Sequence, residues 1–184
     1  MPASKYLFKG RYLGLTEHRS WEYTTRVNAR AVAVLIPLTE KNELVLVEQF
    51  RIPVDSKVVE LPAGLVGDQD DPDEPMETAA QRELEEETGY TAGRMETLLT
   101  CPSSSGMSDE QVTFMLARQL RRTGPGGGDD SEDIAVFEVP LDDVDEWLAA
   151  RLAGGSQVDP KIYSALYWLR RIKDGNAPIP VVSD

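Results

Sequence analysis

The sequence predicts an α/β domain of about eight strands and about three helices. Short runs rich in valine, leucine and aromatic residues indicate the strands, and stretches with apolar residues at helical spacing indicate the helices. Segments of glycine, proline, aspartate and serine separate these elements, as is typical of turns and loops. A chain of 184 residues is long enough for one compact domain with a small N-terminal addition.

The chain begins with two predicted hairpins. Residues 6–15 and 21–25 are strand-like, and the polar residues 16–20 between them indicate a turn. Residues 31–38 and 44–50 are continuously apolar, which predicts two strands buried on both faces and joined as a second hairpin.

The clearest helix of the chain follows a short strand at residues 58–61 and a polar loop at residues 67–73. Residues 75–88 have proline in the first turn and helix-forming residues throughout. Gly89 stands where a left-handed C-cap is expected. These signals predict a helix that ends at residue 88.

The second half of the chain predicts three strands and two helices, at residues 95–100, 111–118 and 134–137 and at residues 141–152 and 159–172. The glycine-rich residues 124–130 lack the lysine and the following helix of a phosphate-binding loop, so we interpret them as a flexible hairpin loop. We expect three parts: an N-terminal hairpin at residues 1–28, a main domain at residues 29–174 and a tail at residues 175–184.

The charge balance excludes several classes of partner. The chain has 32 acidic and 19 basic residues, a formal net charge of -13. Nucleic acids and anionic membranes are held chiefly by lysine and arginine, so both are disfavoured as partners. No stretch resembles a signal peptide or a membrane span, and we therefore expect a cytoplasmic protein.

A single cysteine and a single histidine narrow the possible chemistry. Cys101 cannot form an internal disulfide, and His18 lies in a predicted turn. Histidine-dependent catalysis and zinc sites rich in histidine or cysteine are therefore improbable. The chemistry of an enzyme with this composition would depend on carboxylates, hydroxyls, backbone groups and a hard metal ion.

Four glutamates lie within five residues at the C-terminal end of the predicted helix, at positions 83, 85, 86 and 87. Negative charge is unfavourable there, because the helix dipole is negative at that end. Glu83, Glu86 and Glu87 fall within one arc of about 100° around the helix. A solvated acidic face is one interpretation, and a site for a hard cation such as Mg²⁺ is the other.

The residues RELEEETGY, 82–90, resemble the core of the Nudix box, and Glu74 stands eight residues before Arg82 as that box requires. The family consists of hydrolases that cleave a diphosphate linked to a further group. Gly64 is followed by nine residues before Glu74, where the box has five, which indicates a four-residue insertion in the loop. The resemblance implies the Nudix fold, a mixed β-sheet sandwiched between helices, with a small N-terminal β hairpin.

Further segments resemble the ADP-ribose and nucleoside-diphosphate-sugar pyrophosphatases of this family, namely residues 21–22, 26, 48–51 and 58–65. This resemblance implies that Glu83, Glu86 and Glu87 bind metal together with the backbone carbonyl of Ala63. The ions would be two or three Mg²⁺ per site, with Mn²⁺ as a possible substitute. The resemblance also implies that Glu86 and Arg82 are catalytic residues, and Arg82 would act by orienting a glutamate.

The resemblance also implies a substrate site shared between the two subunits of a homodimer. Trp21 would stack on the base, and Glu22 would accept a hydrogen bond from the amine of the base. Arg26 and Arg51 would contact the phosphates or the ribose. Leu65 and Tyr12 are further predicted substrate contacts. Without the resemblance, we would interpret Trp21 as an ordinary aromatic residue of a strand. We would interpret Arg51 as a member of an ion pair at the rim of the domain.

Glu110, in the serine-rich segment before residue 111, matches the glutamate that activates water in the related pyrophosphatases, with Asp109 as the second candidate. The predicted reaction is hydrolysis of ADP-ribose to AMP and ribose 5-phosphate. A broader nucleoside-diphosphate-sugar hydrolase, for example of GDP-mannose, and a non-catalytic ADP-ribose sensor are the alternatives. An RNA 5′-end hydrolase is disfavoured by the negative charge.

Overall fold

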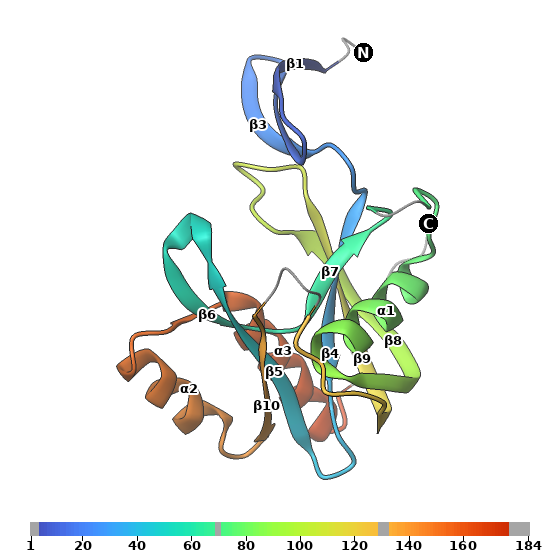
Figure 1. Cartoon of the computed structure of the whole chain (residues 1–184), viewed down its shortest axis with the longest axis vertical. Helices are drawn as coiled ribbons and strands as arrows, with labels where there is room; N and C mark the ends of the chain where they lie inside the picture. Colours follow the sequence, from blue (N-terminus) through green and yellow to red (C-terminus); the bar gives the residue numbers. More distant parts are fainter. Residues whose placement is uncertain (1–3, 69–70, 129–132, 177–184) are drawn as a thin grey trace.

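The computed structural model describes residues 4–68, 71–128 and 133–176. A small N-terminal sheet protrudes from a larger body in which helices lie on both sides of mixed β-structure (Figure 1). This architecture confirms the predicted fold class. No helix among the described residues is long and apolar enough to span a membrane.

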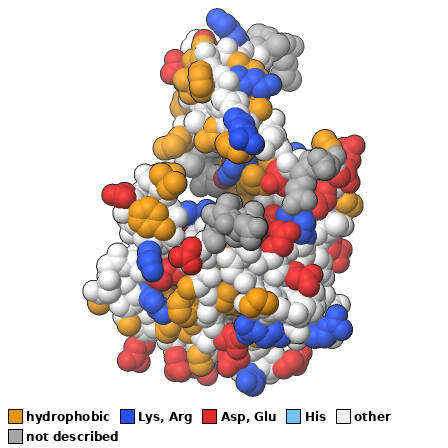
Figure 2. Space-filling view, viewed as in Figure 1, with side chains coloured by type: hydrophobic (Ala, Val, Ile, Leu, Met, Phe, Trp, Pro, Cys, Tyr) orange, Lys and Arg blue, Asp and Glu red, His pale blue; other side chains and the backbone are white. Residues whose placement is uncertain are grey.

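The N-terminal sheet has three antiparallel strands, β1 (Lys5–Lys9), β2 (Leu13–His18) and β3 (Trp21–Arg26). The single strand predicted at residues 6–15 is divided by a turn, in which the Gly10 N–H donates to the Leu13 carbonyl at 2.9 Å. Several large hydrophobic side chains are exposed on this protruding sheet, among lysine and arginine side chains (Figure 2).

One sheet of the body has the strand order β7 (Ala63–Val66), β4 (Ala31–Pro37), β9 (Gln111–Arg122) and β8 (Tyr90–Pro102). β4 and β9 are parallel, and the other neighbours are antiparallel. Alternate residues of β4 enter two separate cores, Val34 on one face and Leu35 on the other. This confirms the prediction that this apolar run is buried on both faces.

The second sheet has the order β10 (Ala135–Pro140), β5 (Glu43–Arg51), β6 (Ser56–Glu60) and β11 (Gln157–Val158). The predicted hairpin of β4 with β5 is therefore wrong, although an isolated bridge joins Leu38 to Leu44. The physical reason is that β7 and β9 occupy both edges of β4. A short 3-10 helix, η1 (Ile52–Val54), turns the chain from β5 into β6.

The predicted hairpin loop at residues 124–130 is also wrong. β9 has β4 and β8 on its two edges, so the next strand, β10, pairs with β5 in the other sheet. The described residues 124–128 therefore lead from one sheet toward the other, and residues 129–130 lie outside the described part of the chain.

Helix α1 (Met76–Thr88) packs Ala80 and Leu84 into the core on one side of the sheets. Helices α2 (Val144–Ala153) and α3 (Pro160–Lys173) contribute to the core on the other side. The Asp159 carboxylate caps α3 by accepting from the Lys161 N–H at 2.7 Å. The predicted helices agree with these three, whereas β7 and β11 were not predicted. Most of the predicted tail lies outside the described residues.

Candidate functional site

A pocket of about 370 Å³ opens where the N-terminal ends of β4 and β9 meet β7 and α1. The polar and charged side chains that line it are Arg26, Arg51, Glu60, Asp68, Glu83, Glu87, Glu110 and Lys161. The pocket therefore gathers five carboxylates and three cations from seven parts of the chain. Val32, Leu61 and Val112 supply apolar wall.

The backbone of β7 lies directly against the glutamates of α1. The Ala63 N–H donates to Glu87 Oε2 at 3.1 Å. A Cβ atom on Gly64 would lie 1.8 Å from Cδ of Glu83, so the approach of strand and carboxylate requires glycine at this position. Glu83 and Glu87 are thus held beside the same stretch of strand, next to the Ala63 carbonyl that was predicted to bind metal.

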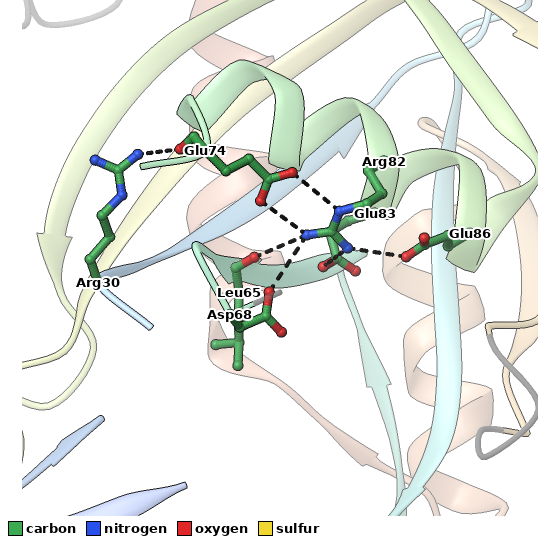
Figure 3. A network of polar contacts seen from close by, with 7 residues as sticks. All are labelled: Arg30, Leu65, Asp68, Glu74, Arg82, Glu83 and Glu86. Carbon is green, nitrogen blue, oxygen red and sulfur yellow. Dashed lines mark hydrogen bonds and ion pairs between the residues drawn. The ribbon is translucent and has the colours of Figure 1, made fainter. Parts of the chain in front are cut away.

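Arg82 lies at the centre of a network of carboxylates (Figure 3). Its Nη1 is 2.7 Å from Glu83 and 3.2 Å from Glu86, and its Nε is 3.3 Å from Glu74. Its Nη2 donates to the Leu65 carbonyl at 3.3 Å and lies 3.7 Å from Asp68. Arg82 therefore orients three glutamates from one position, and it does not line the pocket.

The network shifts the pKa values of its members in opposite directions. Burial raises the pKa of Glu83 to about 7, against the lowering effect of the Arg82 charge. The hydrogen bond from Arg82 holds the pKa of Glu74 below its usual value. Burial alone would lower the pKa of Arg82, but the bonds and charges of Glu74 and Glu83 outweigh it and raise that pKa.

Glu74 keeps its place although the loop before it is longer than in the motif. Its carboxylate binds Arg82, and its backbone carbonyl accepts from Arg30 (Figure 3). The Glu74 N–H donates to the Asp71 carbonyl at 3.0 Å, which closes a turn just before α1. These contacts give Glu74 the role of fixing Arg82.

Two arginines predicted to contact substrate are paired with carboxylates that face the same pocket. Arg26 Nε lies 2.6 Å from Glu110 Oε1, and Arg51 Nε lies 2.7 Å from Glu60 Oε2. Burial raises the pKa of Glu60, and the Arg51 contact opposes that rise. Both arginines of the pocket are thus paired with carboxylates, and an anionic ligand can replace each carboxylate as the partner of its arginine.

The segment that carries Glu110 is attached to the N-terminal sheet. The Thr24 N–H donates to the Met107 carbonyl at 2.8 Å, and the Asp109 N–H donates to the Thr24 carbonyl at 3.3 Å. β3 and the predicted catalytic loop therefore form one connected unit, with Asp109 exposed and Glu110 turned into the pocket.

Three predicted substrate residues lie away from the pocket. Trp21 is 62% exposed and Tyr12 is 54% exposed on the protruding sheet, and Glu22 is exposed beside Trp21. None of the three lines the pocket. Their contact with a substrate in the site of a second subunit stays a prediction.

The sequence did not predict three of the charged residues that line this pocket, Glu60, Asp68 and Lys161. Glu60 could have been predicted from the sequence, because a charged residue inside the apolar run Val58–Leu61 needs a partner. Nothing in the sequence distinguishes Asp68 or Lys161, since a loop aspartate and a lysine in the first turn of a helix are common on protein surfaces.

The C-terminal end of α1 is capped by the glycine-rich segment that follows β9. The Gly127 N–H donates to the Glu87 carbonyl at 2.8 Å, and the Gly128 N–H donates to the Glu86 carbonyl at 3.0 Å. Gly126 has a φ of 71°, and a Cβ atom there would lie 2.4 Å from the Thr88 carbonyl carbon. This segment satisfies helix carbonyls next to two predicted metal ligands.

The predicted metal ligands agree with a hard cation in donor type. Glu83, Glu87 and the Ala63 carbonyl offer oxygen atoms around the pocket, as Mg²⁺ and Mn²⁺ require. Within the described residues, no three acidic, histidine or cysteine side chains converge closely enough to form a ready metal centre. Glu86 is turned toward Arg82, and its side chain is 46% exposed.

Comparison with known proteins identifies the family. The NUDIX domain model matches residues 27–163, which is well over half of the chain. An ADP-ribose pyrophosphatase of Bacillus subtilis is 38% identical over 142 residues, covering 76% of this chain and 71% of the relative. A methanol dehydrogenase activator of Bacillus methanolicus is 38% identical, covering 64% of this chain and 62% of the relative.

A GDP-mannose pyrophosphatase of Enterobacter sp. is 34% identical and covers 59% of each chain. Among solved structures, an ADP compounds hydrolase superposes with a TM-score of 0.69 at 19% identity, covering 96% of this chain and 95% of the other. At that identity the similarity concerns the fold.

The fold and the box helix define a Nudix domain, and the chain belongs to the Nudix family. This confirms the predicted family and, at the level of the family, the predicted class of enzyme, a Nudix diphosphatase.

Proposed function

We propose that this protein is a metal-dependent diphosphatase that hydrolyses ADP-ribose to AMP and ribose 5-phosphate. The observation that carries the proposal is the position of Glu83 and Glu87 against the β7 backbone, in a pocket that also contains Arg26, Arg51 and Glu110. The similarity to the Bacillus subtilis ADP-ribose pyrophosphatase supports the choice of substrate.

Glu83 and Glu87, with the Ala63 carbonyl, are the residues that would hold Mg²⁺, and Glu86 would join them by leaving Arg82. Bound Mg²⁺ supplies Lewis acidity toward the diphosphate and lowers the pKa of the attacking water. The buried position of Glu83 fits this role. Burial raises the pKa of its carboxyl group, and a bound cation would lower that pKa by favouring the charged form.

Arg26 and Arg51 bind the diphosphate by exchanging their carboxylate partners for phosphate oxygens. The exchange by Arg26 frees Glu110, which lies 2.6 Å from it in the structure. Glu110 then accepts a proton from the water that attacks phosphorus, and the P–O bond to the leaving phosphate breaks. Substrate binding and activation of the base are thereby linked through one ion pair.

We also propose a homodimer in which the protruding sheet of each subunit completes the site of the other. Trp21, Tyr12 and Phe8 are more than half exposed on this sheet, which is unusual for large apolar side chains. Trp21 would stack on the base, and Glu22 would accept a hydrogen bond from the adenine amine. Sedimentation equilibrium of the protein and of Phe8→Lys would test the dimer.

GDP-mannose is the second candidate substrate, since several curated relatives at 34–38% identity are GDP-mannose pyrophosphatases. An aromatic stack accepts either base, so specificity would depend on hydrogen bonds such as that of Glu22. A non-catalytic sensor is less favoured, because a sensor has no use for paired glutamates held against Ala63 and Gly64.

The test is a phosphate-release screen with Mg²⁺ and a coupled phosphatase, using ADP-ribose, GDP-mannose, UDP-glucose and dinucleoside polyphosphates. We expect the highest kcat/KM with ADP-ribose, and a kcat that is lower by orders of magnitude for Glu87→Gln. A higher kcat/KM with GDP-mannose would replace the proposed substrate. Binding of ADP-ribose in calorimetry, without turnover of any compound in the screen, would establish the sensor instead.

A further inference from the structure

A second pocket, of about 350 Å³, lies at the other ends of β4 and β9 from the pocket described above. It is formed where the turn after β4, the end of β9, the start of the segment leading into α2 and the last turns of α3 meet. None of the residues that line it belongs to the first pocket.

Arg118 supplies the charge of this second pocket. It continues the face of β9 that carries Phe114 and Leu116 into the core beneath α3. Its Nε is buried and has no hydrogen-bond partner among the described residues. Arg118 also lines the pocket, and a guanidinium group binds an oxyanion through two parallel N–H groups.

Lys173 adds a second positive charge at the pocket. Its Nζ lies 3.1 Å from Asp142, but both side chains are more than half exposed, so this pair is weak and can be exchanged. Glu40 is the one acidic lining residue among those described, which leaves the lining with a positive balance in a protein of net charge -13.

The rest of the lining is largely apolar. Leu38, Leu141, Leu169 and Ile172 line the pocket beside Arg118. Next to Arg118, Gln119 adopts a φ of 56°, a conformation that non-glycine residues rarely adopt. It lies between the pairs Arg94–Arg118 and Ala92–Leu120, where the β8–β9 ladder is interrupted. Such strain is often stored at ligand sites.

We propose that this pocket binds a small organic anion. The carboxylate or phosphate group of the ligand binds Arg118 and Lys173, and a short apolar part contacts Leu169 and Ile172. A volume of about 350 Å³ is within the range of small-molecule sites and exceeds the needs of an inorganic ion. The site is separate from the diphosphate pocket and does not depend on the function proposed for it.

The test is a titration of ¹⁵N-labelled protein followed by amide chemical shifts, with hexanoate, hexyl phosphate and the neutral hexanamide as probes. We expect saturable shifts around Leu169 and Ile172 with at least one of the two anions and none with hexanamide. The anion with the tighter isotherm distinguishes a carboxylate from a phosphate ligand. Equal shifts with hexanamide, or no saturable shift with either anion, would overturn the proposal.

Arg118→Gln should weaken binding of the anion at least tenfold. Arg121→Gln is the matched control, since Arg121 is exposed on the same strand and makes the same change of charge outside the pocket. Ile172→Trp, which fills the pocket without removing charge, should also abolish binding and serves if Arg118→Gln does not fold. Unchanged affinity in folded Arg118→Gln would rule out the site.

Discussion

Helix α1 is held in two different ways along its length. On the side that faces β7, ion pairs from Arg82 to Glu74, Glu83 and Glu86 set the side chains. At its C-terminal end, backbone N–H groups of Gly127 and Gly128 bind the helix carbonyls. A carboxylate in an ion pair can leave its arginine to bind a metal, and an arginine can leave its carboxylate to bind a phosphate. The backbone cap of the helix does not change its partners. The site thus combines charged side chains that can exchange partners with backbone hydrogen bonds that hold the end of α1.

The largest effect is expected where a carboxylate of α1 that lines the pocket is removed. Glu87→Gln should lower kcat with ADP-ribose by orders of magnitude at ordinary Mg²⁺ concentrations, because a neutral amide is a poor ligand for a hard cation. Glu85→Gln is the matched control, since Glu85 is exposed on the same helix and lies outside the pocket. Similar losses in both variants would show that the charge of the helix matters rather than its ligands.

A second test concerns the carboxylate that is held by Arg26 and lies outside α1. Glu110→Gln should reduce kcat by about 10²-fold or more, the usual contribution of a general base, with Mn²⁺ binding by calorimetry unchanged. Asp109→Asn, one residue away and exposed, should retain most activity. Normal turnover by Glu110→Gln would remove this residue from the mechanism.

The backbone cap should be tested by stability rather than by chemistry. Gly126→Ala should lower the free energy of unfolding by about 1–3 kcal/mol, because alanine is strained at a positive φ and its Cβ meets the Thr88 backbone. Gly124→Ala, in the same segment with open space around it, should have little effect. Equal denaturant midpoints for the two variants would contradict the capping role.

The smallest effect is expected for Glu74, whose contribution should depend on pH. Its pKa is lowered in the folded state, so its stabilisation is present above its ordinary pKa and is lost as pH falls through the lowered value. Glu74→Gln should therefore cost up to about 1 kcal/mol at pH 7, as expected for a partly exposed ion pair, and less at pH 4. A constant difference across this range, in urea melts, would exclude the ionic role.

The elements that could be predicted are those that depend on local sequence. The limits of α1 followed from Pro75 and Gly89, because helix hydrogen bonds join residues four apart. The grouping of Glu83, Glu86 and Glu87 followed from the same geometry. The strand pairing of β4 with β7 and β9 could not be predicted, since it depends on which distant strands occupy each edge.

By itself, the sequence determined the family, the box helix with its carboxylates and the charge that disfavours polyanionic partners. Only the tertiary structure decided that Glu110 meets Arg26, that Glu60 meets Arg51 and that Gly127 caps α1. The reason is physical: periodicity and capping are encoded within one turn of chain, whereas these contacts join residues brought together by long-range packing. The position of Arg118 in the second pocket belongs to the same group.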